Sequence, residues 1–371
     1  MSILVLNVGS SSVKFATFAR APTGEQELSR GQRARAAGLA PGDAIADDDL
    51  ALVAEMLDAA ERAHGALEAV GHRVVHGGRA FFAPVAIDAQ SLAAIAALAP
   101  LAPLHQPHNL MGVRAVARLR SGLTQVACFD TAFHRTQPEL HRRLPLPESF
   151  FEDGIERYGF HGLSYSWLTQ EIVRLRGAAP KRMLAFHLGA GASACAILDG
   201  RSHDTSMGFS TIDGLMMATR PGALDAGVIL HLLGQGATLR ELDDLLYTRS
   251  GLRGVSGLTA DMKTLLESGK DSARRAVEMF CRRAAVVGAG LAVSLGGLDA
   301  IVFTGGIGEH APVGRAKIVE QLALLGARVD AQRNANNDAR ISPDGAAVEC
   351  WIVKADEERV IAEATERLLS K

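Results

Sequence analysis

Two stretches, near the start and the middle of the chain, repeat one pattern: an apolar run, a turn of small residues and a second apolar run. The first is LVLNVGSSSVKF at residues 4–15, and the second is MLAFHLGAGASACAIL at residues 183–198. A constant offset of 180 residues aligns Leu4 with Leu184, Asn7 with His187, Gly9 with Gly189 and Val13 with Ser193. Both copies are typical of strand, turn and strand, which predicts a duplication and two related α/β domains.

The glycine turns of these repeats suit phosphate binding. A glycine turn after a strand often holds phosphate, although the usual versions lead into a helix. In the first repeat the residues after the turn alternate as in a second strand, and Lys14 lies among them. Two hairpin turns can bind one polyphosphate from opposite sides. A third cluster, DAIVFTGGIGEHAPVGRAKIVEQLALLG at residues 299–326, predicts a buried strand, a turn and an amphipathic helix, where a nucleotide phosphate or ribose can approach the backbone.

Size, charge and composition narrow the class of protein. A chain of 371 residues is too long to form one small hydrophobic core, which predicts two domains. A hydrophobic share of 48% and a charged share of 22% are ordinary for a globular protein. The net charge of −2 indicates no general attraction to nucleic acid or to anionic membranes. We therefore expect neither nucleic acid nor a membrane as a partner.

Three further features predict a cytoplasmic protein. The first strand begins within three residues, and no basic segment precedes an apolar one, which argues against a signal peptide. The longest uncharged apolar stretch, residues 284–298, is shorter than the ~20 residues of a membrane helix, so we expect a buried helix there. The four cysteines form no metal-binding pair, and we expect reduced, mostly buried thiols at Cys128, Cys195, Cys281 and Cys350.

Between the repeats, helical and strand patterns alternate. Residues 19–46 are rich in Ala, Gly, Pro and Arg, show no clear period and predict irregular surface structure. Acidic residues followed by apolar residues at helical spacing predict a helix over 47–64 that ends at Gly65. A strand in AVGHRVVHGG, helical stretches near 90–99 and 109–120, and a strand in TQVACFD follow.

Two arginines lie in settings that suit an anion. Arg73 follows apolar strand residues between His72 and His76, and Arg220 lies in the Gly- and Pro-containing stretch MATRPGALDAG. A guanidinium group pairs with a carboxylate or phosphate through two parallel hydrogen bonds, so two convergent arginines suit an oxyanion substrate. A surface arginine with a solvated head group is the alternative for each.

Other polar residues allow a functional and a structural interpretation. Asp130 ends a strand in FDTAFH, where α/β sites are usually built, or it caps the next turn. His161, in RYGFHGLSY, acts on a substrate or is structural. Glu357 and Glu358 open the last helix, where they bind Mg²⁺ or stabilise the helix dipole. No His-x-x-x-His pattern on a predicted helix supports a zinc site, and no Walker lysine motif, DFG set or GxSxG elbow occurs. The residues present suit phosphoryl transfer.

Together the motifs resemble those of acetate kinases, in the same order along nearly the whole chain. They are LVLNVGSSSVKF, GHRVVHGG, APLHQPHN, FDTAFH, RYGFHG, HLGAGAS, DTSMGFSTIDGLMMATRPGALD, GVSGL and FTGGIGEH. The resemblance implies an α/β fold of two duplicated actin-like (ribonuclease H-like) domains facing a nucleotide cleft, one formed by residues 1–131 and 359–371 and the other by 132–358. It also implies reversible transfer of the ATP γ-phosphoryl group to acetate, giving acetyl phosphate and ADP, with Mg²⁺ or Mn²⁺, in a homodimer.

The same resemblance implies roles for individual residues. Asn7 and Glu357 would place Mg²⁺, and Arg73 would bind the carboxylate. Arg220 and His161 would neutralise the transferring phosphoryl group. The acyl methyl group would face Val75, Leu104, Phe160 and Thr211. The nucleotide would contact Lys14, His187, Leu188, Gly189, Ala190, Gly191, Asp261, Met262, Lys263, Gly306, Ile307, Gly308, Glu309 and His310.

Asp130 matches the essential acid of this family. A carboxylate nucleophile has no proton to lose at neutral pH, so organising Arg73 or the metal ion is the more plausible role and proton transfer is the alternative. Nucleotide and acyl-chain preference depend on five departures from the commonest family pattern: Ala190 replaces asparagine, Met262 an aromatic residue, Lys263 an arginine, His310 an asparagine and Thr211 a proline. The alternatives are a propionate or butyrate kinase on the same scaffold, and a non-enzymatic actin-like ATP-binding or filament protein, which would not need Arg73, His161 and Arg220 together.

Overall fold

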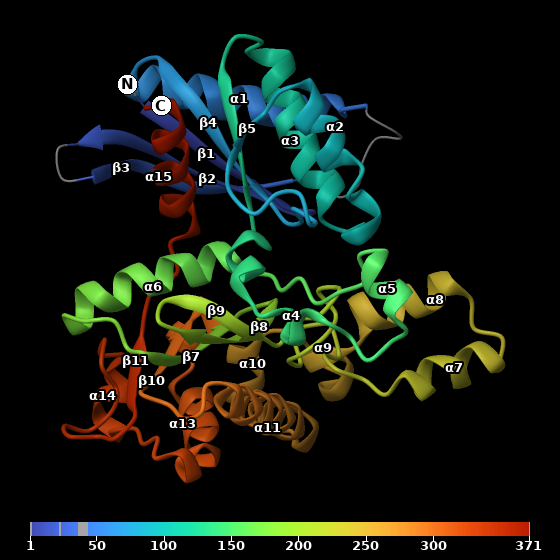
Figure 1. Ribbon diagram of the computed structural model, residues 1–371, viewed down its shortest axis with the longest axis vertical. Coiled ribbons are helices and arrows are strands. Elements are labelled where there is room, and N and C mark those ends of the chain that lie inside the picture. The colour runs from blue at the N-terminus through green and yellow to red at the C-terminus, as the bar shows by residue number, and fades with distance from the viewer. Residues whose placement is uncertain (1, 22–23, 36–43, 371) are drawn as a thin grey trace. The chain divides into compact units, whose positions relative to one another are not determined.

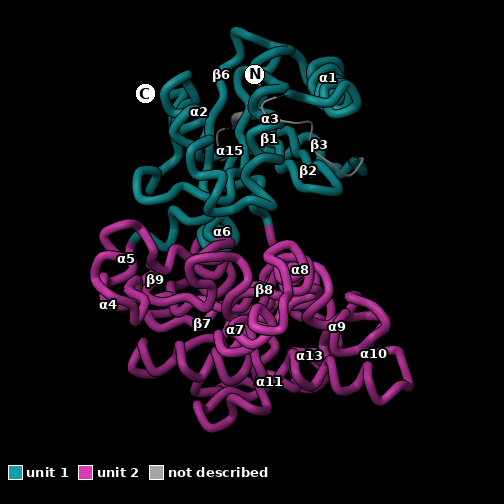
Figure 2. The backbone as a smooth tube through the Cα atoms, turned by 90° about the vertical axis from the view of Figure 1, so that its right-hand side faces the viewer, with its two compact units in different colours: residues 1–135, 162–167, 356–371 teal, residues 136–161, 168–355 magenta. Residues whose placement is uncertain are grey.

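The computed structural model describes residues 2–21, 24–35 and 44–370. The chain forms two compact units (Figure 2). Unit 1 comprises Met1–Arg135, Gly162–Trp167 and Asp356–Lys371, and unit 2 comprises Thr136–His161 and Leu168–Ala355. The chain therefore leaves unit 1 and returns to it twice, so that its last helix belongs to the unit that its first residues form.

The described residues of unit 1 form a six-stranded sheet with the order β3-β2-β1-β4-β6-β5 (Figure 1). Its strands are β1 (Ser2–Val8), β2 (Ser12–Ala21), β3 (Gly24–Ala34), β4 (Leu67–Val74), β5 (Val85–Ala86) and β6 (Thr124–Phe129). β1, β2 and β3 pair antiparallel, whereas β1, β4 and β6 run parallel. The carboxyl ends of parallel strands meet at one edge of a sheet, which is where α/β proteins build their sites.

The described residues of unit 2 form a five-stranded sheet with the order β11-β10-β7-β8-β9. Its strands are β7 (Arg182–Leu188), β8 (Ala192–Leu198), β9 (Arg201–Thr205), β10 (Ala300–Thr304) and β11 (Glu349–Ile352). Again the first three strands pair antiparallel, and β7, β10 and β11 run parallel. Because the two sheets repeat one arrangement, the predicted duplication is confirmed.

The two hairpins differ by one residue in their turns. Val8 pairs with Val13 at the end of the first hairpin, and Leu188 pairs with Ala192 at the end of the second. The offset of 180 residues suits the first strand of each hairpin, but the predicted match of Val13 with Ser193 is wrong. The second turn is shorter, so Ala192 takes the equivalent position.

Alternate side chains of β1 pack into two separate cores in unit 1. Leu6 belongs to a cluster that includes residues of α1 (Asp47–His64) and α3 (Gln106–Leu119). Val5 belongs to a second cluster that includes residues of α15 (Glu357–Leu369). Helices therefore cover both faces of this sheet, which explains why its central strands are apolar almost throughout.

The helices predicted between the two repeats are confirmed. α1 begins at Asp47 with three acidic residues in its first turn, which stabilise the helix dipole. It ends before Gly65, whose φ of 81° suits glycine. α2 (Ala89–Ala96) and α3 lie near the two predicted stretches, although α3 begins earlier, at Gln106.

The prediction of irregular structure for residues 19–46 is wrong over much of the described part. β2 continues to Ala21, and Gly24–Ala34 form β3 at the edge of the sheet. The residues of β3 are mostly polar, and most of those whose exposure is described lie at the surface. This strand therefore lacks the apolar alternation by which strands are recognised. Residues 22–23 and 36–43 lie outside the described residues.

In unit 2 the long helix α11 (Asp271–Ser294) packs against the sheet. Gly288 of this helix lies so close to Phe186 of β7 that a Cβ atom on Gly288 would be 2.6 Å from the Phe186 ring. The buried helix predicted for 284–298 is confirmed for one face only, since Val286 and Val293 are exposed. The other helices are α4 (Glu139–Arg142), α5 (Glu148–Glu152), α7 (Ala226–Gly234), α8 (Leu239–Asp244), α9 (Gly251–Ser256), α10 (Met262–Glu267), α12 (Gly305–His310), α13 (Pro312–Gln321) and α14 (Ala331–Asn336), while α6 (Gly162–Arg176) belongs to both units.

Two further predictions concern the whole chain. All four cysteines are free and buried, as expected. Burial raises the pKa of each thiol, which keeps it protonated and unreactive at neutral pH. None of the helices in the described parts of the chain combines the length and the apolar character that crossing a membrane requires.

Candidate functional site

Arg73 and Asp130 form an ion pair at the carboxyl ends of β4 and β6 in unit 1. The Nη2 atom of Arg73 donates to Oδ2 of Asp130 at 2.6 Å, and its Nε atom donates to Oδ1 at 3.0 Å. The Asp130 side chain is 1% exposed. β4 and β6 are parallel neighbours, so the sheet brings together two residues that lie far apart in the sequence.

Asn7 and Glu357 complete a polar cluster around Arg73. The Nη1 atom of Arg73 donates to Oδ1 of Asn7 at 3.4 Å, and its Nε atom lies 3.7 Å from Oε2 of Glu357. Burial on its own would lower the pKa of Arg73, but the carboxylates of Asp130 and Glu357 raise it above its ordinary value. Three residues singled out from the sequence, Asn7, Asp130 and Glu357, thus surround the permanently charged guanidinium group of Arg73.

The oxygen atoms of Asn7 and Glu357 fit a magnesium ion. Mg²⁺ prefers oxygen ligands, keeps several waters and is usually bound through one or two protein groups together with substrate phosphates. Among the described residues no group of three or more His, Cys, Asp or Glu side chains is placed to hold a metal ion. A magnesium ion bound here would take its remaining ligands from water and phosphate.

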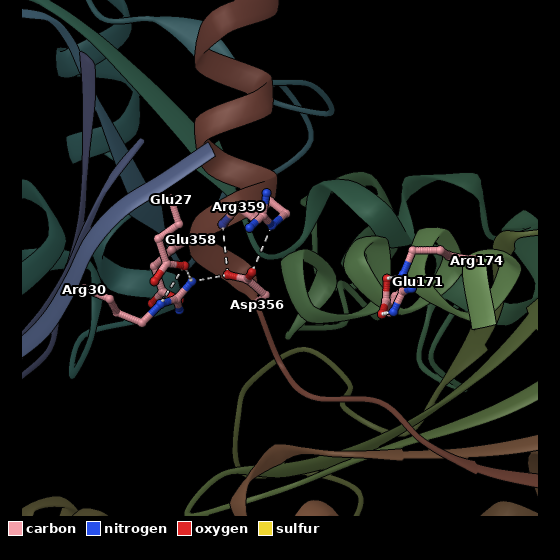
Figure 3. Close-up of polar contacts among 7 residues, drawn as sticks. All are labelled: Glu27, Arg30, Glu171, Arg174, Asp356, Glu358 and Arg359. Carbon is pink, nitrogen blue, oxygen red and sulfur yellow. Dashed lines mark hydrogen bonds and ion pairs between the residues drawn. The ribbon is translucent and has the colours of Figure 1, made fainter. Parts of the chain in front are cut away.

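A second ionic network, which sequence reasoning missed, holds the start of α15. Arg30 on β3 donates to Glu358 at 2.8 Å, to Asp356 at 2.5 Å and to Glu27 at 2.7 Å (Figure 3). Burial and the neighbouring Glu357 raise the pKa of Glu358, and Arg30 opposes this rise. The network fixes the backbone that carries Glu357. Arg30 lies in the segment outside the quoted motifs, so no motif marked it.

Lys14 lies on the first hairpin of unit 1. It is opposite Asn7 in the register of β1 and β2, and its side chain is exposed. The turn between these strands is closed by the N–H of Gly9, which donates to the carbonyl of Ser12 at 2.9 Å. The hairpin thus places one lysine across from one member of the Arg73 cluster.

The four residues assigned to the acyl group are divided between the units. In unit 1 Val75 is buried, with its N–H donating to Oδ1 of Asn109 at 3.0 Å, and Leu104 is 38% exposed. In unit 2 Phe160 and Thr211 are both buried. Three of the four side chains are therefore largely removed from solvent.

His161 has a backbone conformation that is rare outside glycine. Its φ of 60° and ψ of 24° are left-handed, and it precedes the first residue of α6. Its Nδ1 atom is hydrogen-bonded to Oγ of Ser193 at 2.9 Å, and its ring stacks on that of His187 with centroids 4.1 Å apart. A strained backbone of this kind costs about 1–3 kcal/mol and occurs often at functional sites. The contacts hold the imidazole ring in one orientation.

Arg220 approaches the turn of the second hairpin. Its Nη1 atom donates to the carbonyl of Thr211 at 2.7 Å. A Cβ atom at Gly191 would lie 2.9 Å from Nη2 of Arg220 and 3.2 Å from Nε2 of His161, so a larger residue here would displace these two side chains. Burial lowers the pKa of Arg220 to about 10, and among the described residues no carboxylate pairs with it. The guanidinium is therefore charged at neutral pH and available to an anion.

The third glycine cluster forms a helix rather than a turn. Gly305, with a φ of 78°, lets the chain pass directly from β10 into α12, which contains Gly306, Ile307, Gly308, Glu309 and His310. The backbone N of Gly306 lies 3.9 Å from a Cβ atom built on Gly189, so the clusters approach each other. Glu309 accepts hydrogen bonds from the N–H groups of Gly305 and Ala355. It is thus tied into the backbone, while His310 is exposed.

The remaining predicted nucleotide contacts lie at two places in unit 2. Asp261 precedes α10 and caps it by accepting from the N–H of Thr264 at 2.8 Å. Met262 is buried, and Lys263 is exposed. Leu188 is buried at the end of β7, and the carbonyl of Ala190 accepts from the N–H of Ala218. Asp261 therefore has a structural contact of its own, whereas the chain leaves Lys263 accessible.

Each unit thus presents a distinct chemical setting. Unit 1 offers a paired arginine with nearby carboxylate and amide oxygens, which suits a carboxylate substrate and a hard cation. Unit 2 offers Arg220 and His161 at a glycine turn, which suits the negative charge of a phosphoryl group.

Comparisons with known proteins agree with one another. The sequence model described as the acetokinase family matches residues 2–363. An acetate kinase of Rhodopseudomonas palustris (strain TIE-1) is 44% identical over 390 residues, covering 99% of this chain and 98% of that protein. A solved propionate kinase from Francisella tularensis subsp. tularensis SCHU S4 is similar with a TM-score of 0.88, 34% identity and 98% of each chain covered. The solved acetate kinase of Porphyromonas gingivalis is similar with a TM-score of 0.88 and 32% identity, and the match covers 99% of each chain. The fold predicted from the motifs is confirmed.

Proposed function

Because the chain belongs to the acetokinase family, we propose that it transfers the γ-phosphoryl group of ATP to the carboxylate of acetate, reversibly, giving acetyl phosphate and ADP. The observation that carries the proposal is the approach of Arg220 and His161 to the Gly191 turn. Two basic groups at a glycine turn stabilise the charge of a transferring phosphoryl group, where positioning and charge neutralisation supply most of the catalysis.

The proposed reaction needs no proton carrier. A carboxylate oxygen of acetate attacks the γ-phosphorus, the bond from that phosphorus to the bridging oxygen breaks, and ADP leaves. Arg73 binds the carboxylate, Asp130 holds Arg73 in place, and Arg220 and His161 stabilise the phosphoryl group. Asp130 is assigned an organising role because its carboxylate is buried and paired with a cation.

We assign the nucleotide and metal contacts as the sequence predicted them. Lys14 and residues 187–191, 261–263 and 306–310 bind ATP or ADP. Asn7 and Glu357 hold Mg²⁺, for which Mn²⁺ can substitute, and the metal ion neutralises phosphate charge. Two oxygen donors beside Arg73 support this assignment.

Acetate is the proposed substrate, and propionate is the main alternative. Relatives named acetate kinase favour the first, and the similar solved propionate kinase keeps the second open. Thr211 stands where proline is usual in the family, so the volume of the acyl pocket decides between them. A single methylene in an apolar pocket is worth only ~1–3 kcal/mol.

We also propose that the protein is a cytoplasmic homodimer. The domain division proposed from the sequence, residues 1–131 with 359–371 and residues 132–358, differs from units 1 and 2 at residues 132–135, 162–167 and 356–358. Dimerisation is supported by α7, whose sequence AGVILHLLG has no acidic, lysine or arginine residue. Val228, Leu230 and Leu233 on this helix are all exposed. Apolar patches of this kind on a soluble protein mark interaction sites, and a second copy of this chain is the partner that we assign.

The test of the function is direct detection of the product. Purified protein with MgATP, acetate and hydroxylamine should yield acetohydroxamate, since hydroxylamine traps acyl phosphates. A reaction without acetate provides the control for any hydroxamate that does not derive from acetate. Nucleotide binding without any trapped product would favour the non-enzymatic ATP-binding alternative.

A further inference from the structure

Arg35 is a buried cation beside the 9–12 turn of unit 1. Its side chain is 1% exposed. Its Nε and Nη2 atoms donate to the two carboxylate oxygens of Asp49, in the first turn of α1, at 2.5 and 2.6 Å. Its Nη1 atom donates to Nδ1 of His108, on α3, at 2.7 Å, because arginine has no acceptor. Groups from two helices therefore fix this guanidinium.

The same residue holds three successive carbonyl groups of the turn. Its Nη1 atom lies 3.2 Å from the oxygen of Gly9 and 3.5 Å from that of Ser10, and its backbone N–H donates to Ser11 at 2.9 Å. In a trans peptide the C=O and the following N–H point in opposite directions. Attraction of these oxygens to Arg35 therefore turns the N–H groups of Ser10, Ser11 and Ser12 away from it.

We propose that Arg35 is a positioning residue for nucleotide binding, which fixes the 9–12 turn so that its successive N–H groups receive a phosphate group. Successive backbone N–H groups in a turn form a concave anion site. The identity of the anion as a nucleotide phosphate rests on the proposed function. Arg35 itself acts only through the backbone, since its guanidinium is occupied by Asp49, His108 and the turn.

Two variants separate this role from mere stability. Arg35→Lys keeps the charge, but one ammonium group cannot bind both oxygens of Asp49 and the turn carbonyls together. The double variant Arg35→Met/Asp49→Leu removes the buried ion pair as a unit, and such apolar replacement is often neutral or stabilising. The two variants perturb folding in different ways. The proposal can therefore be tested as long as one of them folds.

Arg120→Met is the matched control in the same unit. Arg120 follows α3 and pairs with Asp58 and Glu61 of α1 at 2.7 and 2.8 Å. It therefore ties together the same two helices as Arg35, but it does so through the C-terminal half of α1, whereas Asp49 lies in the first turn of that helix. A general loosening of α1 and α3 should appear in this variant as well.

The experiment measures ADP binding by calorimetry, amide hydrogen exchange of residues 10–12 without ligand, the KM values for ATP and acetate, and Tm. We expect both Arg35 variants to bind ADP ~10–100-fold more weakly, the size of effect typical for groups that orient direct ligands. Exchange in the turn should become faster, and the KM for ATP should rise more than that for acetate. Arg120→Met should match the wild type in ADP binding and in turn exchange.

A folded double variant with wild-type ADP affinity and unchanged turn exchange would overturn the assignment. Equal loss of ADP affinity in Arg120→Met would also overturn it, because the effect would then be one of helix packing. The exchange and calorimetry need no turnover. A wild-type protein that makes no acyl phosphate therefore counts against the proposed function alone.

Discussion

The guanidinium of Arg73 binds both carboxylate oxygens of Asp130 across two parallel strands, and the aspartate is almost completely buried. A carboxylate in this position is committed to an ion pair. Its protonation would leave Arg73 without its closest carboxylate, which is costly in a buried setting. This relationship makes Asp130 an organiser of the substrate-binding arginine and leads to the first prediction.

Asp130→Asn should lower kcat/KM for acetate by ~10–100-fold, since the amide keeps an acceptor but loses the charge that holds Arg73. The dependence of kcat/KM on pH should keep its shape in the variant. Kinetics from pH 5 to 9 provide the measurement. Disappearance of an acidic limb in the variant would instead identify Asp130 as a proton carrier.

Arg220→Ala should reduce kcat by ~10²–10³-fold and change the KM for ATP much less. Its guanidinium lies at the Gly191 turn, without a carboxylate partner among the described residues, and is assigned to charge that develops in the transition state. Steady-state kinetics provide the measurement, with Arg249→Ala as a control, because Arg249 is exposed and pairs with Asp244. An Arg220→Ala enzyme that keeps most of its kcat would remove this residue from the catalytic group.

Turnover should require a divalent cation, because Asn7 and Glu357 offer only two oxygen donors and the phosphates supply the rest. Chelation should abolish activity, and added Mg²⁺ or Mn²⁺ should restore it. Calorimetry of MgADP binding to Glu357→Gln gives a readout that is independent of turnover. Full activity in chelator with metal-free ATP would contradict the site.

Stability should fall as the pH drops from about 6.5 to about 4, partly because of His72. Burial lowers the pKa of this histidine to about 4, against the smaller effect of its hydrogen bond to Gln125. Between the two pH values the unfolded chain binds more protons than the folded one, so the free energy of unfolding decreases. By pH 4 the low pKa of His72 should have reduced the free energy of unfolding by roughly 2–3 kcal/mol relative to neutral pH.

His72→Gln keeps an amide that can bind Gln125 but does not titrate, so it should reduce this pH dependence. Urea unfolding at pH 7 and at pH 4.5 measures the difference. An equal loss of stability in the wild type and in the variant would assign the acid sensitivity to other groups, of which buried His76 is one, since burial lowers its pKa to about 4 as well.

Parts of the fold and site could be predicted because they depend on local signals. Strand ends mark Arg73 and Asp130, and parallel pairing then brings them together. The helix start at Glu357 and the two glycine hairpins are visible in the same way. Their geometry agrees with the predicted grouping in unit 1, while the roles of the individual residues stay predictions.

Other features depend on contacts between distant segments and could not be predicted. β3 is a polar edge strand without apolar alternation, so its partnership with β2 is invisible locally. Arg30 and Arg35 acquire their importance only from Glu358 and Asp49, which other elements supply. The left-handed backbone of His161 could not be predicted either, because histidine adopts this conformation more often than most residues but still only in a small share of cases.

The measurement that tests the central claim most directly is kcat/KM for acetate, propionate and butyrate at saturating MgATP, with the acyl phosphate trapped by hydroxylamine. An apolar site that suits the methyl group of acetate should discriminate against longer acyl chains, and each added methylene should cost about 10–200-fold in kcat/KM. We predict that acetate is the best substrate, that propionate is usable and that butyrate is poor. If propionate leads, the scaffold assignment holds and Thr211→Pro should restore acetate preference. Butyrate equal to or better than acetate would contradict the assignment of this chain as an acetate kinase.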